Sequence, residues 1–213
     1  MSVQIGRKAP NLKVTKWVQG TNTNLDKQND NIVVVEVFQV NCPGCFMYGI
    51  PESIEIYNKY KPEGVSVIGM ATAFEDFDKN TLENLQLLLE TGEVVGETKK
   101  MLQADKISYK IPYPVAMDSL IKQSGEATKE KMDSLIKNQI PNFDEQPEDY
   151  KKQIYDRVKD YFMSKEFSAE TFEMYSLPGT PSSILVDRKG ILRDISFGQN
   201  GLLESKIQTL LNE

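Results

Sequence analysis

The 213-residue sequence contains no histidine and only two cysteines, and both shortages restrict its chemistry. Without histidine, the chain cannot build a Ser-His or Cys-His nucleophilic pair from its own residues. Most catalytic zinc sites also use histidine, and two thiolates supply only half of a tetrahedral shell, so we expect no metal and no cofactor. Two cysteines this close together do not form the widely spaced framework of a disulfide-stapled domain. A redox pair, a two-ligand metal site and an inert coincidence are the interpretations left open.

The sequence also lacks long apolar runs and any excess of positive charge. No segment approaches the roughly 20 apolar residues that a membrane helix needs, and residues 1–8 contain no apolar signal-peptide core. The net charge is −6, whereas a nucleic-acid surface needs clustered positive charge. We therefore expect a cytoplasmic protein that binds neither membrane nor nucleic acid. The sequence does not indicate its oligomeric state.

Strand and helix patterns alternate along most of the chain, which predicts an α/β fold with a mixed central sheet flanked by helices. The run 32–37 is almost entirely β-branched, as in a strand buried on both faces. The length favours one domain, 1–213, with an insertion. The expected strands are 9–20, 32–37, 65–71, 113–117, 183–186 and 191–196, and the expected helices are 46–60, a helix capped by Asp78 or Asn80 that continues through Leu89, and 202–211.

Residues from about 119 to 170 differ from the rest, because they are rich in charged residues and hold few strand formers. Two amphipathic helices are expected here, separated by 141–147. We interpret this block as an inserted helical hairpin that serves as a lid, as a partner surface or as neutral decoration. The apolar stripe of the first helix is Met132, Leu135 and Ile136, and that of the second is Tyr150, Ile154, Val158, Tyr161 and Phe162.

The two cysteines form a Cys-Pro-Gly-Cys motif between a buried strand and a helix. Unpaired N–H groups and the helix dipole favour an anion at a helix N-terminus, so the pKa of Cys42 should be depressed, in the range of about 3.5–7.5 typical of such sites. Cys45 lies one turn later, where it can resolve a mixed disulfide. Pro43 suits the first helical position, and Gly44 leaves the sulfurs uncrowded. This spacing at a strand-to-helix junction predicts a redox pair.

Glu36 is the one charged residue in the apolar run, six residues before Cys42. A buried carboxyl tends to stay protonated. With a raised pKa it can accept and return a proton when Cys45 attacks or leaves. The alternative is that Glu36 faces solvent at a sheet edge.

Four stretches of the chain together resemble the thioredoxin superfamily, specifically its redoxin branch. That branch contains the TlpA/ResA-like thiol-disulfide oxidoreductases and the AhpC/TSA-like group. The resemblance implies a thioredoxin-like fold, and Glu36 falls at the position of the family's buried acid. The four stretches are 6–10, 36–45, 114–118 and 179–190.

The resemblance also implies roles for residues outside the cysteine motif. Pro181 looks like the family's cis-proline, packed against the redox cysteines, and the backbone of Thr180 would then pair with an extended substrate segment. Pro51 resembles the family's helix-kinking proline. Asn41 replaces the tryptophan that commonly precedes the first cysteine, which alters the contact surface. The substrate-contacting residues expected on this basis are Thr180, Pro43, Gly44 and Asn41.

We therefore predict a thiol-disulfide oxidoreductase that exchanges electrons with protein or small-molecule thiols and disulfides. One alternative is a peroxiredoxin-like thiol peroxidase, although Gln39 stands where the peroxidase pattern has threonine. The other is a non-catalytic binding module that uses the helical insertion.

Overall fold

The computed structural model describes residues 3–28, 30–122, 128–164, 166–199 and 201–213. The chain forms two compact units. The main unit comprises Met1–Ser119 and Ala169–Glu213, and the inserted unit comprises Leu120–Ser168. The main unit contains the large sheet and both cysteines, so it positions the site.

A six-stranded mixed sheet forms the main unit, with the order β1-β4-β3-β2-β7-β8. The strand β2 (Ile32–Phe38) pairs in parallel with β3 (Val65–Ala71) and antiparallel with β7 (Ser182–Val186). All of β2 is buried, as the continuous β-branched run predicted for a central strand. The remaining strands of this sheet are β1 (Val14–Gln19), β4 (Val115–Asp118) and β8 (Leu192–Phe197).

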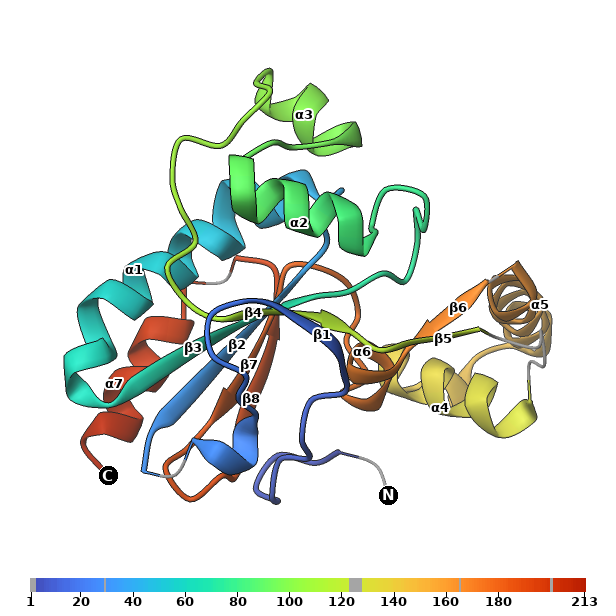
Figure 1. Ribbon diagram of the computed structural model, residues 1–213. Coiled ribbons are helices and arrows are strands. Elements are labelled where there is room, and N and C mark those ends of the chain that lie inside the picture. Colours follow the sequence, from blue (N-terminus) through green and yellow to red (C-terminus); the bar gives the residue numbers. More distant parts are fainter. Residues whose placement is uncertain (1–2, 29, 123–127, 165, 200) are drawn as a thin grey trace. The chain divides into compact units, whose positions relative to one another are not determined.

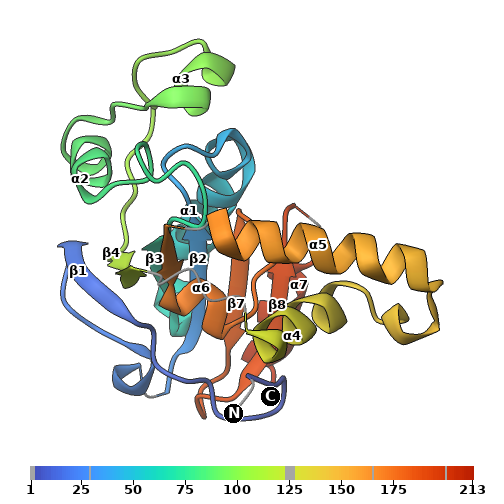
Figure 2. The same cartoon turned by 90° about the vertical axis from the view of Figure 1, so that its right-hand side faces the viewer.

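Helices cover both faces of this sheet (Figures 1 and 2). The helices α1 (Ile50–Tyr60) and α7 (Leu203–Leu211) lie on one face, and α6 (Glu170–Met174) lies on the other. Lys59 and the Tyr60 hydroxyl both donate to Glu204, each at 2.7 Å, which joins α1 to α7. The architecture is the mixed α/β arrangement predicted above. Short 3-10 turns span Leu25–Lys27, Lys61–Glu63 and, in the inserted unit, Phe143–Glu145.

The connection from β3 to β4 carries two helices, α2 (Leu82–Thr91) and α3 (Gly96–Leu102), which lie beyond the carboxyl end of β3 (Figure 1). The prediction that Asp78 or Asn80 caps α2 is wrong. Thr81 is the cap, and its side chain accepts a hydrogen bond from the amide of Asn84 at 3.1 Å. The sequence did not predict α3, because its two turns are too short to show an apolar stripe.

The inserted unit contains the two expected helices, α4 (Lys129–Gln139) and α5 (Glu148–Ser164). The rings of Phe143 and Tyr155 meet edge to face at 5.6 Å between centroids, and the Tyr155 hydroxyl bonds Asp133. A two-stranded sheet of β5 (Leu120–Lys122) and β6 (Phe167–Ala169) accompanies the helices. These strands have three residues each, which is too short for a pattern to predict. Assignment of the whole chain to one domain stays a prediction.

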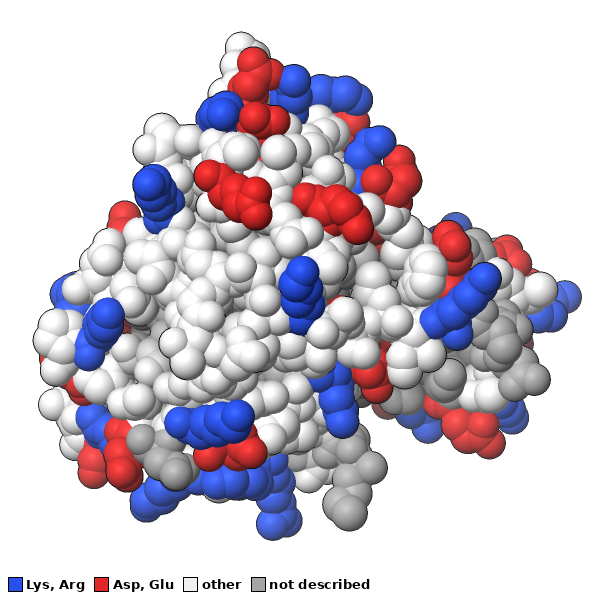
Figure 3. Space-filling model, in the orientation of Figure 1, with Lys and Arg blue, Asp and Glu red and all other residues white. Residues whose placement is uncertain are grey.

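Basic and acidic side chains are interspersed on the face shown in Figure 3. Within the described ranges, no helix is both long and apolar enough to cross a bilayer. The expectation that the chain does not bind nucleic acid stays a prediction.

Candidate active site

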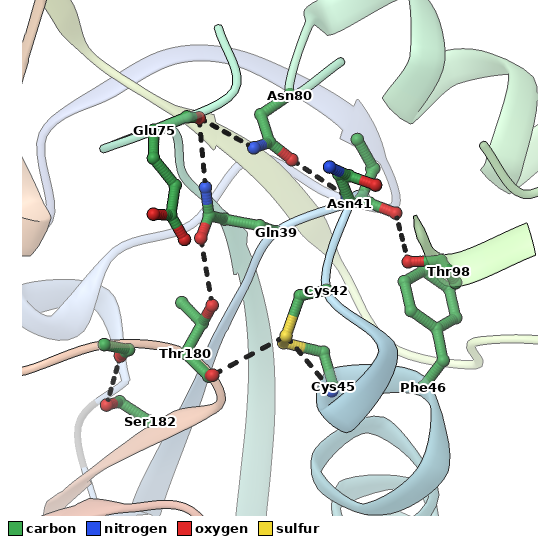
Figure 4. The surroundings of a disulfide bond; sticks show 12 residues. Gln39, Asn41, Cys42, Cys45, Phe46, Glu75, Asn80, Thr98, Thr180 and Ser182 are labelled. Carbon is green, nitrogen blue, oxygen red and sulfur yellow. Dashed lines mark hydrogen bonds between the residues drawn. A yellow bond between two sulfur atoms is a disulfide. The ribbon is translucent and has the colours of Figure 1, made fainter. Parts of the chain in front are cut away.

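Cys42 and Cys45 are joined in a disulfide, with their Cα atoms 5.4 Å apart (Figure 4). Cys42 lies four residues beyond the end of β2, and the helix begins at Pro43. The side chains differ in access, because Cys42 is 9% exposed whereas Cys45 is fully buried. A partner molecule therefore reaches the Cys42 sulfur first.

Backbone groups of two segments approach the Cys42 sulfur. The amide of Cys45 donates a hydrogen bond to Cys42 Sγ at 3.2 Å. The carbonyl oxygen of Thr180 lies 3.6 Å from the same sulfur. An N–H donor in the first helical turn stabilises a thiolate, and the carbonyl can accept the proton of the reduced thiol. The position therefore serves both protonation states of the Cys42 sulfur.

The Thr180–Pro181 peptide bond is cis, as the resemblance implied, and the Pro181 ring packs against the helix that carries the cysteines. Two glycines face the ring. A Cβ added at Gly44 would make an ordinary contact of 3.7 Å with Pro181 Cδ. A Cβ added at Gly49 would lie 2.6 Å from Pro181 Cβ and even closer to Glu36 Oε1. Gly49 therefore packs directly against both Pro181 and Glu36.

Glu36 is a buried, unpaired acid. It is 3% exposed, and its Oε1 has no hydrogen-bond partner among the described residues. Burial raises the pKa of Glu36 well above its usual range, and the charge of Glu52 raises it further. The sheet-edge alternative is excluded, because β2 lies at the centre of the sheet. The role of Glu36 in proton transfer to or from Cys45 stays a prediction.

Gln39 connects the cis-proline loop to the loop that follows β3. Its Oε1 accepts a hydrogen bond from the Thr180 hydroxyl at 3.1 Å, and its Nε2 donates to the carbonyl of Glu75 at 3.3 Å (Figure 4). The side chain is 1% exposed. Gln39 thus holds Thr180, whose carbonyl approaches Cys42. The sequence marked Gln39 only as the residue in place of a threonine, and its partners are too distant along the chain to be predicted.

Asn41 organises the loops around the disulfide. Its amide nitrogen Nδ2 donates to Asp76 at 2.7 Å, and its Oδ1 accepts from the Glu97 amide at 2.7 Å. Its backbone amide donates to Asn80 Oδ1 at 2.9 Å. Both polar ends of the side chain are therefore already bonded within the chain. A substrate contact by Asn41 stays a prediction, and so do the contacts expected of Pro43 and Gly44.

The backbone flanking the disulfide has two further partners that the sequence analysis did not find. The Thr98 hydroxyl donates to the carbonyl of Val40 at 3.0 Å, and the Tyr109 hydroxyl donates to the carbonyl of Phe46 at 2.9 Å. A π-helical turn, Cys45–Gly49, precedes α1, and Pro51 lies in the first turn of that helix. The kink expected at Pro51 stays a prediction. No motif in the sequence surrounds Thr98 or Tyr109, so only the fold reveals these contacts.

Among the described residues, no group of three or more Cys, His, Asp or Glu side chains is placed to hold a metal ion. The expectation that the protein uses no cofactor stays a prediction.

Comparison with solved structures places this arrangement among thioredoxin-like proteins. A crystal structure of a thioredoxin-like superfamily protein has a TM-score of 0.60 and 25% sequence identity, with 97% of each chain covered. A thiol-disulfide isomerase from Corynebacterium glutamicum has a TM-score of 0.61 and 27% identity, with 98% of this chain and 97% of its own covered. The thioredoxin domain of a thiol-disulfide oxidoreductase from Bacteroides vulgatus shares the fold at a TM-score of 0.52 and 15% identity, with 98% and 99% covered.

No protein-family model matches the sequence, and no curated protein matches it at a significant level. The structural comparisons confirm the predicted thioredoxin-like fold and the similarity to thiol-disulfide oxidoreductases. Together with the Cys42–Cys45 pair they support general thiol-disulfide chemistry. The similarity to the AhpC/TSA-like group stays a prediction.

Proposed function

We propose that this protein is a thiol-disulfide oxidoreductase that cycles Cys42 and Cys45 between dithiol and disulfide. The observation that carries the proposal is the pair itself, with a slightly exposed Cys42 at the helix start and a fully buried Cys45 one turn later. The solved structure from Corynebacterium glutamicum, described as a thiol-disulfide isomerase, supports the same chemistry.

In the reducing direction, the Cys42 thiolate attacks one sulfur of a partner disulfide. A Cys42–partner bond forms, and the second partner sulfur leaves as a thiolate. Cys45 then attacks Cys42 Sγ, the bond to the partner breaks, and the Cys42–Cys45 disulfide forms. Two electrons pass from the protein to the partner. In the oxidising direction, the same steps run backwards.

Glu36 handles the proton of the buried sulfur in this scheme. When Cys45 attacks, its thiol must lose a proton, and the ionised Glu36 carboxylate accepts it. When the disulfide opens, the protonated Glu36 returns the proton to the Cys45 thiolate. A raised pKa suits both tasks, because it makes the carboxylate a stronger base toward the Cys45 thiol and favours the protonated carboxyl that later returns the proton.

Thr180 is proposed to bind the substrate backbone. Its carbonyl lies 3.6 Å from Cys42 Sγ, and a partner segment bound to Cys42 would therefore lie beside this loop. Extended backbone pairing gives affinity without strong demands on sequence. The partners proposed are proteins or small molecules that carry thiols or disulfides.

The direction of exchange depends on the compartment. We carry forward the prediction of a cytoplasmic location, where disulfides are kept reduced and the protein would act as a reductant. Trapping the thiols in intact cells by rapid alkylation tests this. Mostly reduced Cys42 and Cys45 agree with the prediction, and a mostly oxidised pair contradicts it.

Insulin reduction driven by dithiothreitol tests the proposed function. We expect turnover by the parent protein and none by Cys42→Ser. A redox titration of the pair against glutathione should give one two-electron transition. If Cys42→Ser reduces insulin as fast as the parent, the proposal is wrong. Adding hydrogen peroxide in place of insulin tests the peroxidase alternative in the same assay.

A further inference from the structure

The carbonyl oxygen of Phe46 lacks the partners that a helix normally supplies. In an α-helix it would accept from the amide of Ile50, and in a π-helix from the amide of residue 51. Here the Ile50 amide donates to the Cys45 carbonyl. Residue 51 is proline, which has no N–H. The turn that follows the second cysteine therefore leaves an acceptor unpaired.

Tyr109 satisfies that acceptor from a distant part of the chain. Its hydroxyl donates to the Phe46 carbonyl at 2.9 Å, across 63 residues of sequence. Tyr109 is half-buried, and burial raises the pKa of its hydroxyl. The hydroxyl therefore stays a donor at any physiological pH. A tyrosine is suited to this task because its ring has few rotatable bonds to immobilise.

The same segment holds the backbone on the other side of the disulfide. Near its start, the Thr98 hydroxyl donates to the Val40 carbonyl at 3.0 Å, and the Glu97 amide donates to Asn41 Oδ1 (Figure 4 shows Thr98). Residues 97–109 thus contact the chain just before Cys42 and just after Cys45. We call this stretch the clamp segment.

We propose that Tyr109 is a positioning residue, which holds the first turn after the cysteines so that the Cys45 amide stays directed at Cys42 Sγ. That hydrogen bond, at 3.2 Å, is stronger to a thiolate than to a neutral sulfur. Loosening the turn therefore destabilises the reduced, ionised form more than the disulfide. The consequence for catalysis rests on the proposed function, whereas the effect on the sulfur itself does not.

The test replaces Tyr109 with phenylalanine, which removes only the hydroxyl. The pH dependence of Cys42 alkylation by iodoacetamide, followed by mass spectrometry on the reduced protein, reports the thiolate. We expect the apparent pKa of Cys42 to rise. The equilibrium with glutathione should shift about threefold to tenfold toward the disulfide, and a tenfold shift corresponds to about 30 mV for this couple.

Tyr175→Phe is the matched control, because the Tyr175 hydroxyl also donates to a backbone carbonyl, that of Pro10, at 2.5 Å. It should lower stability to a similar degree and leave the Cys42 titration unchanged. If Tyr109→Phe and Tyr175→Phe shift the apparent pKa of Cys42 equally, the role of Tyr109 is merely structural.

Pro51→Ala provides a rescue, because alanine restores an N–H and the turn can then satisfy the Phe46 carbonyl itself. In the Pro51→Ala background, Tyr109→Phe should have little effect on the Cys42 titration. An undiminished shift there would overturn the proposal. If Tyr109→Phe does not fold, Thr98→Val tests the other end of the clamp segment with the same readout and the same expected sign. An unchanged alkylation profile refutes the inference, whereas a parent protein that fails to reduce insulin refutes only the proposed function.

Discussion

Replacing Gly49 with alanine should disturb the site more than any other single methyl group added to its helix. Gly49 has helical backbone angles, φ −61° and ψ −52°, so its backbone tolerates alanine. The new Cβ would meet Pro181 Cβ at 2.6 Å and would press on Glu36 Oε1. Neither neighbour can yield easily, because one is a proline ring and the other is a buried side chain on the central strand.

Gly44→Ala is the matched control for this substitution. Gly44 also has helical angles, φ −62° and ψ −33°, and its new Cβ would make a 3.7 Å contact with the same proline. Both substitutions gain up to about 1 kcal/mol of helix propensity. Only Gly49→Ala adds the cost of overpacking, about 1–3 kcal/mol. The difference in the free energy of unfolding between the two variants isolates the cost of overpacking.

Urea denaturation of the oxidised proteins measures this difference. We expect Gly44→Ala to unfold at or above the parent midpoint and Gly49→Ala to unfold below it, with equal slopes. Insulin reduction by Gly49→Ala should also slow, because the added methyl displaces Pro181, next to Thr180, and Glu36, the proposed proton carrier. If both variants are equally stable, the close packing of Gly49, Pro181 and Glu36 is wrong.

Three further predictions concern the chemistry and the insertion. Glu36→Gln should slow exchange by about 100-fold. The folded parent holds a proton on Glu36 that the unfolded chain loses near pH 4.5, so the stability of the parent falls as the pH rises from there through the raised pKa. Denaturation midpoints measured across this pH range should therefore show the variant becoming more stable relative to the parent. Cys45→Ala should accumulate a mixed disulfide through Cys42, visible as an added mass on the intact protein, and its absence would contradict the order of attack. A variant lacking residues 125–165, which lie within the inserted unit, should reduce insulin at the parent rate, and a lost rate would give the insertion a part in exchange.

The central strands could be predicted almost to the residue. The expected strand 65–71 matches β3, and 32–37 falls one residue short of β2. Both are largely apolar runs, interrupted by Glu36 in the first and Ser66 in the second, and such runs are typical of strands at the centre of an α/β sheet. The local pattern was therefore enough to predict these two strands, without knowledge of distant contacts.

The elements that the sequence missed owe their existence to tertiary contacts. The helix α3 has seven residues, and its start is held by the side chain of Asn41, far away in the chain. The strands β5 and β6 have three residues each and exist through pairing with one another. Segments this short show no periodicity of their own, so local pattern could not reveal them.

The residues of the site also fall into two groups, those that the sequence predicted and those that only the fold revealed. The two cysteines and Glu36 stood out because each breaks a local pattern, and Pro181 stood out through the resemblance. Gln39 and Tyr109 do not break a pattern. Gln39 bonds the Thr180 hydroxyl across 141 residues of sequence, and Tyr109 bonds the Phe46 carbonyl across 63. Sequence spacing cannot predict such pairings.

Among the described residues of the main unit, two acids are buried, Glu36 and Asp118, and they differ in their hydrogen-bond partners. Asp118 is fully buried, and its carboxylate accepts four hydrogen bonds, from the amides of Ser119, Thr171 and Phe172 and from the Thr72 hydroxyl. Those bonds join β3, β4 and α6, and they offset part of the rise that burial causes in its pKa. Glu36 Oε1 has no such donor among the described residues. An unpaired buried carboxyl costs stability, and the proposed proton transfer with Cys45 would give that cost a function.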